Sequence, residues 1–421
     1  MTTSTDIHPQ TTSTSEEGGT RPIGRHDWVP VAAAITAVAW GGNEFTPLLV
    51  MYRSVSEFTA VTVNGLLAAY VIGIVPALLI GGPLSDILGR RTLMLPAAPL
   101  SMAGSILLAV GPTSPLMLGA GRILCGLALG LVMAVGTTWM KELSEKESPA
   151  AGARRASLAL TIGFLVGAGV ASALAQWAPF PTHASYCLHI ILTITTGLWV
   201  LRVPETRIAE AGAARSIRPK TLVNLLRIPS VGHARFLRVV VPVAPWVFGC
   251  AGAAYAILPN LLSGSAHGVP IAFSGLMTVL TLGCGVGIQV LGRVIDSRHN
   301  ARASVIAMAI ITVGVFIGAF AAQSLNLVTG AIAAALMGMG YGLALVAGLS
   351  EVQRIATPAD LAGLTAVYYS VAYLGFFIPM IFAELSAYIS YPTMFLVGSI
   401  LALVSLLFVA SAWKAHLPAH Y

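Results

Sequence analysis

Twelve apolar runs recur along this chain about every 30 to 35 residues, and each is long enough to cross a lipid bilayer as a helix. Hydrophobic residues make up 56% of the chain and charged residues only 9%, whereas a soluble domain carries about 25% charged residues. The runs lack the polar–apolar alternation that is typical of a membrane barrel. The sequence therefore predicts an all-α integral membrane protein with the spans Trp28–Met51, Thr59–Ile80, Thr92–Val110, Leu116–Met140, Ala156–Trp177, Tyr186–Val203, Leu237–Leu262, Ile271–Leu291, Ser304–Ala322, Leu327–Leu349, Leu361–Tyr388 and Thr393–Trp413.

The basic residues fall almost entirely in alternate loops between these runs. With the N-terminus placed inside, 21 of the 23 Lys and Arg residues lie in cytoplasmic segments, and only Arg53 and Arg122 do not. Cytoplasmic loops of membrane proteins carry this excess of basic residues, so we expect a multi-pass protein of the cell membrane with both termini in the cytoplasm. The same distribution excludes nucleic acid as a partner, because the net charge of +7 is not gathered into one patch.

Composition divides the chain into five segments. Residues 1–24 are rich in Thr, Ser and Glu and carry little apolar surface, which predicts a disordered cytoplasmic tail. Two groups of six runs, residues 25–203 and 237–414, are separated by a polar cytoplasmic loop, residues 204–236, and followed by a short cytoplasmic tail, residues 415–421. The basic loop is either a plain linker or a helix that lies on the anionic membrane surface, and the sequence leaves both open.

A group of charged residues stands between the second and third runs, in the stretch Gly82-Pro83-Leu84-Ser85-Asp86-Ile87-Leu88-Gly89-Arg90-Arg91. An apolar chain that places an Asp and two Arg residues together marks a cytoplasmic turn between two membrane helices. A weaker copy, Gly292-Arg293-Val294-Ile295-Asp296-Ser297-Arg298, follows 210 positions later. The repeat indicates that the chain consists of two similar halves.

The spacing of this stretch resembles the loop signature of the major facilitator superfamily, which lies between the second and third spans of its members. Arg122-Ile123-Leu124-Cys125-Gly126 in the fourth run resembles the R-x-x-x-G signature of the same superfamily, and Pro204-Glu205-Thr206-Arg207 resembles a common end of its first half. The resemblance covers the whole chain through the span count and the two-half layout. It implies twelve transmembrane helices in two six-helix bundles, related by a pseudo-two-fold axis, that rock around a site near the bilayer midplane.

The resemblance also implies that the charged loop latches the two bundles together on the cytoplasmic side. We expect Asp86 near the start of the third helix, where the positive end of the helix dipole favours its charge. Glycine at positions 82 and 89 allows close approach, and the two arginines can pair with Asp86 or with Glu142. The alternative is a capped helix end in a basic turn. The latch residues that we expect are Gly82, Asp86, Gly89, Arg90, Arg91, Glu142, Gly292 and Asp296.

Two ionisable residues lie well inside the apolar runs, and each costs about 2.5–3.5 kcal/mol at the centre of a membrane helix. Glu44, in the first run, is expected to bind and release a proton, with its side chain directed to the interface between the bundles. Arg122, in the fourth run, is expected to contribute to coupling or to the substrate cavity, and Asn43, Tyr70 and Asn64 to add polar lining. The alternative is that Glu44 and Arg122 form a structural ion pair.

The sequence lacks the common motifs of hydrolases, metal sites and nucleotide-binding sites. It contains no G-x-S-x-G, H-E-x-x-H or Walker stretch, the four cysteines sit inside apolar runs without ligand spacing, and the histidines are scattered. His189, in the sixth run, is expected to be a packing residue rather than a proton relay. We therefore expect no enzyme activity, no cofactor and no metal.

The resemblance implies a secondary transporter of a small organic solute, and we expect proton-coupled efflux of a drug or metabolite. Many exporters of this superfamily carry G-x-x-x-G-P-x-x-G-G in the fifth span, whereas this chain has Gly163 and Gly167 but Ala168 in place of the proline. A proton-coupled importer therefore stays open, and a membrane enzyme or assembly factor is a remote alternative. The expected partners are the solute, protons as coupling ion and the lipid bilayer, and we expect a monomer.

Overall fold

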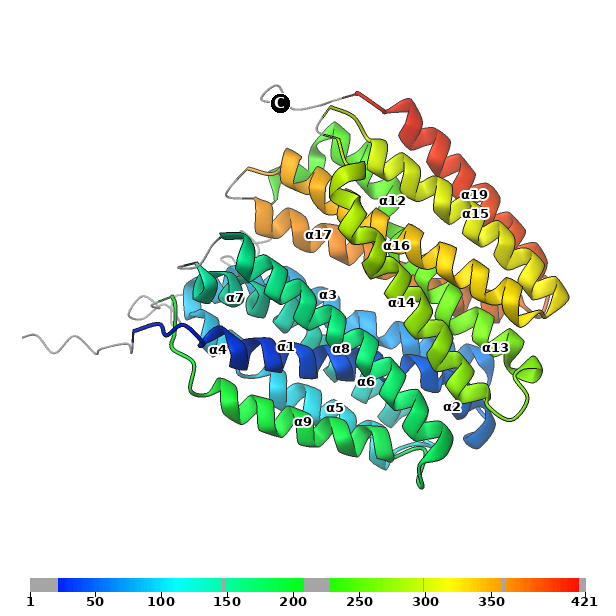
Figure 1. Cartoon of the computed structure of the whole chain (residues 1–421), viewed down its shortest axis with the longest axis horizontal. Helices are drawn as coiled ribbons and strands as arrows, with labels where there is room; N and C mark the ends of the chain where they lie inside the picture. Colours follow the sequence, from blue (N-terminus) through cyan, green and yellow to red (C-terminus); the bar gives the residue numbers. More distant parts are fainter. Residues whose placement is uncertain (1–21, 146–148, 208–227, 298, 358–359, 416–421) are drawn as a thin grey trace, which may run out of the picture.

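The computed structural model describes residues 22–145, 149–207, 228–297, 299–357 and 360–415, and the described residues form helices joined by short loops, without a strand. The chain folds into two groups of helices that follow its two halves, and the helices of the first half lie below those of the second in Figure 1. The all-α prediction is therefore confirmed.

The first half is built from long apolar helices that are interrupted in several places. Pro47, which has no backbone N–H, stands in the short turn that interrupts the first span, and Gly89 interrupts the chain between the second and third spans. The elements are α1 (Trp28–Asn43), η1 (Thr46–Leu48), α2 (Leu49–Val55), α3 (Ala60–Leu88), α4 (Arg90–Met94), α5 (Ala97–Val110), α6 (Pro115–Leu131), η2 (Val132–Gly136), α7 (Thr137–Ser144), α8 (Pro149–Trp177) and α9 (Ala184–Val200).

The second half repeats this pattern with its breaks in the seventh and eleventh spans. Both breaks are followed by a proline, Pro259 after η5 and Pro379 after η7. The elements are η3 (Pro229–Gly232), η4 (Phe236–Val240), α12 (Val241–Gly252), η5 (Ala253–Ile257), α13 (Leu258–Leu262), η6 (Ser263–Ser265), α14 (Pro270–Ile295), α15 (Arg302–Ser324), α16 (Leu327–Ile355), α17 (Leu361–Tyr373), η7 (Leu374–Phe377), α18 (Ile378–Leu385) and α19 (Tyr391–Ser411).

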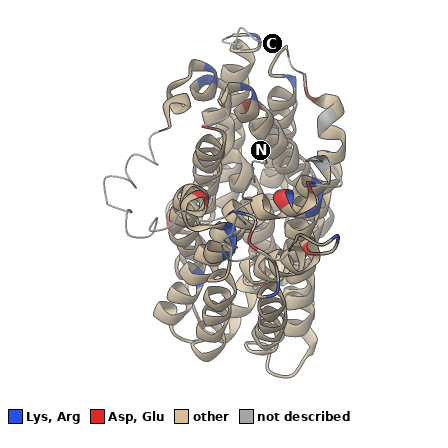
Figure 2. Cartoon of the chain, turned by 90° about the vertical axis from the view of Figure 1, so that its left-hand side faces the viewer, with Lys and Arg blue, Asp and Glu red and all other residues tan. Residues whose placement is uncertain are grey.

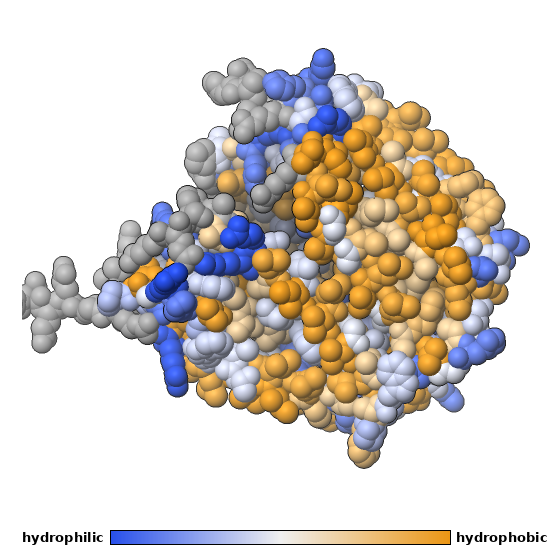
Figure 3. All heavy atoms as spheres, viewed as in Figure 1, coloured by the Kyte–Doolittle hydropathy of each residue, from blue (hydrophilic) through white to orange (hydrophobic). Residues whose placement is uncertain are grey.

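Ten helical stretches among the described residues are long and apolar enough to cross a membrane, and α9 is a shorter apolar helix. Side chains such as Leu198, Val290 and Leu407 are exposed although they are apolar. Figure 3 shows that apolar residues cover the side of the molecule between its hydrophilic ends. This belt is the surface that a helical membrane protein presents to lipid tails.

The two halves bury equivalent helix pairs by the same means. A Cβ on Gly126 of α6 would overlap the carbonyl oxygen of Tyr70 in α3, and a Cβ on Gly342 of α16 would overlap that of Gly285 in α14. The second and fourth spans of each half therefore approach backbone to backbone, as small residues allow in membranes.

The charged residues gather at one end of the molecule, which Figure 2 views directly and which we call the charged end. It is formed by the loops that follow α3, α7, α9, α14 and α16. Most of the two predicted tails and of the predicted central loop (residues 1–21, 208–227 and 416–421) lie outside the described residues.

The opposite end, which we call the far end, is closed by contact between the two halves. Gln176 of α8 donates to the carbonyl of Gly268 and accepts from the backbone N–H groups of Ile271 and Ala272 at the start of α14. One turn further in, Ser172 packs against Gly275 so tightly that a Cβ there would overlap its hydroxyl. The halves are thus joined at the far end by α8 and α14.

Candidate functional site

Three linked chambers lie between the two halves. The outer chamber, about 310 Å³, lies at the charged end between Gly82, Lys141 and Leu361. The middle chamber, about 100 Å³, shares Met133 and Tyr369 with it. The inner chamber, about 30 Å³, is lined by Asn43, Tyr70 and Arg122 from the first half and by aromatic residues from the second, and it shares a wall with the middle chamber. The series leads from the charged end into the centre of the molecule.

Arg122 is the only charged residue that lines the middle and inner chambers, within the described residues. Its side chain is buried, and its Nη1 donates to the carbonyl of Gly42 over 3.2 Å. The guanidinium carbon lies 4.8 Å from the ring centroid of Phe45 and 4.4 Å from that of Tyr70, within the range of cation–π attraction. Its Nε has no hydrogen-bond partner. The cation is therefore held by ring faces and one carbonyl.

The structure brings the other predicted lining residues to the same chamber, except one. Asn43 donates to the carbonyl of Phe164 over 3.0 Å and accepts from the hydroxyl of Thr46 over 2.9 Å. The hydroxyl of Tyr70 is buried without a partner. Asn64 is buried but does not line the chamber.

Glu44 lies elsewhere, which corrects the prediction that it points to the interface between the halves. It is fully buried inside the first half, where it accepts hydrogen bonds from Ser105 of α5 over 3.2 Å and Ser185 of α9 over 2.9 Å. Successive residues of a helix are turned by about 100°, so a helix that directs Asn43 into the chamber directs Glu44 away from it. Within the described residues Glu44 has no ion pair with Arg122, so the structural-pair alternative is wrong as well.

His189 of α9, which we expected to be a packing residue, lies in a hydrogen-bonded network beside Glu44. Its Nδ1 lies 3.7 Å from the Glu44 carboxylate and 2.7 Å from the hydroxyl of Ser105, so this hydroxyl contacts both groups. Its Nε2 lies 3.0 Å from the Ala37 carbonyl and 3.0 Å from the hydroxyl of Thr193. A carboxylate, an imidazole and a shared hydroxyl can hold a proton and pass it between them.

A signal for this buried network was present in the sequence. Ser185, His189 and Thr193 recur every four residues along α9, and Ser101 and Ser105 do so along α5. Residues four apart share one face of a helix, so two apolar spans each carry a polar stripe. The two stripes meet around Glu44.

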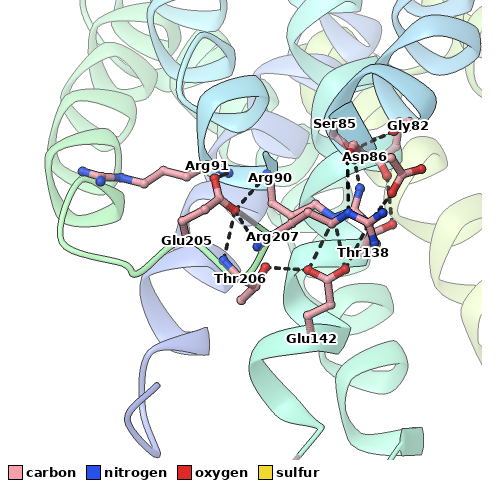
Figure 4. A network of polar contacts seen from close by, with 11 residues as sticks. Gly82, Ser85, Asp86, Arg90, Arg91, Thr138, Glu142, Glu205, Thr206 and Arg207 are labelled. Carbon is pink, nitrogen blue, oxygen red and sulfur yellow. Dashed lines mark hydrogen bonds and ion pairs between the residues drawn. The ribbon is translucent and has the colours of Figure 1, made fainter. Parts of the chain in front are cut away.

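Figure 4 shows the charged loop, in which one arginine joins three elements. The Nη2 of Arg90 lies 2.7 Å from Asp86 at the end of α3 and 3.0 Å from Glu142 of α7, and its Nη1 donates to Ser85. We call Asp86, Arg90 and Glu142 the loop cluster. The prediction that Asp86 stands near the start of a helix is wrong, because α3 continues through it to Leu88. It therefore sits at the negative end of a helix dipole, where Arg90 offsets its charge.

Glu205 organises the backbone of this loop, which the sequence did not reveal. Its carboxylate accepts the N–H groups of Arg90 and Arg91, each over 2.9 Å, and so caps the start of α4. Gly89 has φ +94°, and a Cβ there would meet this carboxylate, so glycine is required for close approach as predicted. Arg91 donates to the carbonyl of Leu201. The acid directly after the sixth span was the available signal.

The other predicted latch residues lie in different halves of the molecule. Gly82 has open space around it and lines the outer chamber, so the prediction that it permits a close contact is wrong in this state. Asp296, at the end of α14, forms an ion pair with Arg354, which also pairs with Glu351. Glu351 in turn binds Arg235 through both of its oxygens. We call Asp296, Arg354, Glu351 and Arg235 the second-half cluster; nearby, Gly292 packs against Val346 at ordinary distance.

Comparison with known proteins assigns this chain to a protein family. A family model described as the Major Facilitator Superfamily matches residues 31–263. The chain belongs to the major facilitator superfamily. Membership in this superfamily indicates a multi-pass membrane transporter of small solutes and not an enzyme, which confirms the family resemblance and the predicted class.

Relatives of this superfamily match part of the chain. A probable polyol transporter 6 from Arabidopsis thaliana is 30% identical over 132 residues, which are 30% of this chain and 26% of that protein. A probable inositol transporter 2 from the same plant is 30% identical over 129 residues, 31% of this chain and 19% of that protein. The chain thus spans about a quarter or less of the length of these two relatives.

Solved structures of the superfamily share the whole fold. A POT family transporter in complex with 5-aminolevulinic acid aligns with a TM-score of 0.72 at 13% identity, over 91% of this chain and 95% of that one. The xylose transporter XylE from E. coli, in a partially occluded inward open conformation, aligns with a TM-score of 0.67 at 15% identity, over 91% and 96%. At this identity the likeness concerns the fold, so the major facilitator fold is confirmed.

Proposed function

We propose that the chain is a proton-coupled secondary transporter that carries a small organic solute through the chambers between its halves by alternating access. The observation that carries this proposal is the series of chambers that leads from the charged end to Arg122, while α8 and α14 close the far end. A cavity that is open at one end and closed at the other is one of the two states that alternating access requires.

We infer twelve spans in two bundles, residues 25–203 and 237–414, in a monomer of the cell membrane. The count takes the broken α1–α2 and the short α9 as spans beside the ten long stretches. The excess of Lys and Arg at the charged end supports a cytoplasmic location of that end, and we infer the same location for both termini.

Cysteine labelling in intact cells tests this orientation. In a background that lacks the exposed Cys187, Thr113→Cys at the far end should react with an impermeant maleimide added outside. His299→Cys at the charged end should react only after the cells are opened. Both positions are exposed, so labelling of His299→Cys from outside would reverse the proposed orientation.

Glu44 is the proposed proton-carrying group. Its carboxylate is buried, it contacts two hydroxyls, and the Ser105 hydroxyl connects it to His189. Asn43, its neighbour in sequence, lines the inner chamber. A change in the charge of Glu44 therefore takes place one residue away from the chamber wall. A carboxylate enclosed by apolar helices is stable only if it is paired, hydrogen-bonded or protonated.

Transport by reconstituted protein tests this role. Glu44→Gln should abolish accumulation driven by a proton gradient and keep downhill exchange, whereas Glu44→Asp should retain part of the accumulation. Glu384→Gln, which changes an exposed acid of α18, is the matched control and should accumulate normally. Gradient-driven accumulation by Glu44→Gln at the wild-type level would show that the carboxylate is structural.

The loop cluster is the proposed latch of the opposite state. In this structure its contacts join elements of the first half, and the outer chamber separates Gly82 from Leu361 at the start of α17. Closure of that chamber brings α17 onto Gly82 and toward the half-exposed Asp86. The N–H groups at the start of α17 then provide the positive helix end that Asp86 lacks here.

The direction of transport is proposed as efflux, with uptake as the second candidate. The glycines Gly163 and Gly167 of α8, which match the first part of the exporters' fifth-span pattern, favour the exporter. Ala168 in place of the exporters' proline, and two relatives named as polyol and inositol transporters, favour the importer. Proteoliposomes with an imposed proton gradient separate the two, because an exporter moves the solute against the proton flow and an importer moves it with that flow.

A further inference from the structure

The inner chamber contains the positive charge of Arg122, which forms no ion pair with an acid among the described residues. Arg122 is 1% exposed, and within the described residues no carboxylate comes within ion-pair distance of its guanidinium. Glu44, the acid that lies inside the first half, is bound to the hydroxyls of Ser105 and Ser185 instead. A buried cation is stable when an anion or a full set of acceptors faces it. One carbonyl and two ring faces are less than that set.

The free polar atoms of the chamber are hydrogen-bond donors. Arg122 Nε and the Tyr70 hydroxyl are both buried without partners, and the Tyr70 ring lies beside the guanidinium. By contrast, Asn43 and Thr46 satisfy each other and the carbonyl of Phe164. A guanidinium with a neighbouring hydroxyl is the donor set that recognises a carboxylate.

The wall opposite these donors is aromatic and flat. Phe248 stacks on Tyr373, with ring centroids 4.3 Å apart, and on Phe376, with centroids 5.1 Å apart. The three rings lie within 18° of one another, and the wall comes from α12, α17 and η7 of the second half. All three rings line the inner chamber and so offer an aromatic surface to a flat apolar group.

We propose that the transported solute is an organic monocarboxylate with a flat apolar body, bound with its carboxylate on Arg122 and Tyr70 and its body on the wall of Phe248, Tyr373 and Phe376. This inference rests on the proposed function, in which the inner chamber is the transport site, and it names the class of solute. The carboxylate is held by the first half and the body by the second, so the solute connects the two halves that move.

The same lining disfavours other classes of solute. An organic cation would meet Arg122 with no acid in the middle or inner chamber to balance it. A polyol presents many hydroxyls, and each needs a partner when it is buried. Besides its tyrosines, the inner chamber offers it Arg122, because Asn43 and Thr46 are already bonded and the other lining side chains are Leu and Phe.

Binding of three matched probes to the purified full-length protein tests the proposal. Benzoate, benzamide and benzylamine share a flat ring and differ in charge. Quenching of intrinsic tryptophan fluorescence should show benzoate binding at least tenfold more tightly than benzamide, with benzylamine weakest. Equal affinity for benzoate and benzamide, or preference for benzylamine, would overturn the proposal.

Variants assign the selectivity to its residues. Arg122→Gln should remove the preference for benzoate over benzamide, Arg122→Lys should restore part of it, and Tyr70→Phe should weaken benzoate binding severalfold without changing benzamide binding. Arg53→Gln removes one exposed charge at the far end and should bind all three probes as the parent does. Full selectivity in Arg122→Gln, or in a well-folded Arg122→Lys a loss as complete as in Arg122→Gln, would overturn the assignment.

A counterflow experiment separates this inference from the proposed function. Exchange of labelled benzoate across proteoliposomes needs no proton gradient, so it does not depend on Glu44 as coupling group. Selective benzoate binding without exchange would keep the anion site and overturn transport through it. Exchange of another solute by protein that does not bind benzoate would keep the transporter and overturn the anion inference.

Discussion

The two halves of the molecule place similar acids at the charged end but expose them differently. Asp296 follows Asp86 by 210 positions and Glu351 follows Glu142 by 209. In the loop cluster the side chains of Asp86 and Glu142 are 46% and 29% exposed, whereas Glu351 in the second-half cluster is 2% exposed. Glu351 is thus buried where its counterpart Glu142 is partly exposed, while Asp296 is 20% exposed.

The two clusters also differ in their arginines. Arg90 is the first residue of α4, and the position 210 residues later is Asn300, which carries no charge. In the second half Arg354 comes from α16, and Arg235, which is fully buried, stands just before η4 and also donates to the carbonyl of Ala415. Two arginines therefore hold the second-half acids, whereas one arginine holds both acids of the loop cluster.

The loop cluster is therefore suited to breaking and re-forming during transport, and the second-half cluster to holding helices together. An exposed ion pair contributes about 0–1 kcal/mol, so the loop cluster can break and re-form during transport. Removing one partner of a buried pair costs about 3–5 kcal/mol, so the second-half cluster stays closed and ties the start of η4 to the ends of α14 and α16. Four substitutions sharpen or break this distinction.

The largest effect is expected for Glu351→Gln. The change leaves Arg235 buried without its bidentate carboxylate partner and should destabilise the protein by about 3–5 kcal/mol. The melting temperature should fall, and little monodisperse protein should be recovered in detergent. Scanning fluorimetry measures the loss. A melting temperature close to that of the parent would mean that the buried cluster is not what holds this end together.

A smaller loss of stability is expected for Arg354→Gln. Arg354 pairs with both Asp296 and Glu351, but Glu351 keeps its bond to Arg235 when Arg354 is removed. The cost should be about 1–3 kcal/mol, the value for charged hydrogen bonds lost at a partly buried site. The same melting assay compares it with Glu351→Gln, and an equal or larger loss would reverse the proposed order within the cluster.

Asp86→Asn is expected to reduce transport without reducing stability. The substitution keeps the size of the side chain and removes the charge that the closed state needs, so flux should fall about tenfold, or ~1.4 kcal/mol in the activation barrier. Flux in proteoliposomes, normalised to folded protein, measures it. The control is Glu145→Gln, which neutralises an exposed acid that follows α7. Normal flux in Asp86→Asn would reduce the loop to a simple turn.

The smallest effect is expected for Glu142→Gln. Arg90 keeps Asp86 and Ser85 as partners, and the pair with Glu142 is partly exposed, so the free energy of unfolding should change by about 0.2–1 kcal/mol. Melting curves of Glu142→Gln and Glu351→Gln, recorded side by side, compare two acids in equivalent positions. Equal losses would break the distinction between an exposed and a buried cluster.

Much of the fold could be predicted from the sequence because each span responds to the bilayer by itself. The length of an apolar run and the charge of its flanking loops decide whether a segment crosses and in which sense. The predicted runs correspond to the helices, although α3 extends beyond Ile80 through the loop motif to Leu88. The meeting of Arg122 with Asn43 and Tyr70 also followed, since polar side chains in spans avoid lipid.

The sequence by itself determined the apolar helices, the charged loops and the two-half layout, because these depend on local periodicity and on transfer between water and lipid. Only the tertiary structure decided which face of each helix meets which neighbour. That choice turned Glu44 toward Ser185 and His189 instead of the chambers, and it sealed Glu351 against Arg235. Helix packing decides which residues distant in the chain become partners. The rotation of one helix against another cannot be predicted from hydropathy or from the number of charges.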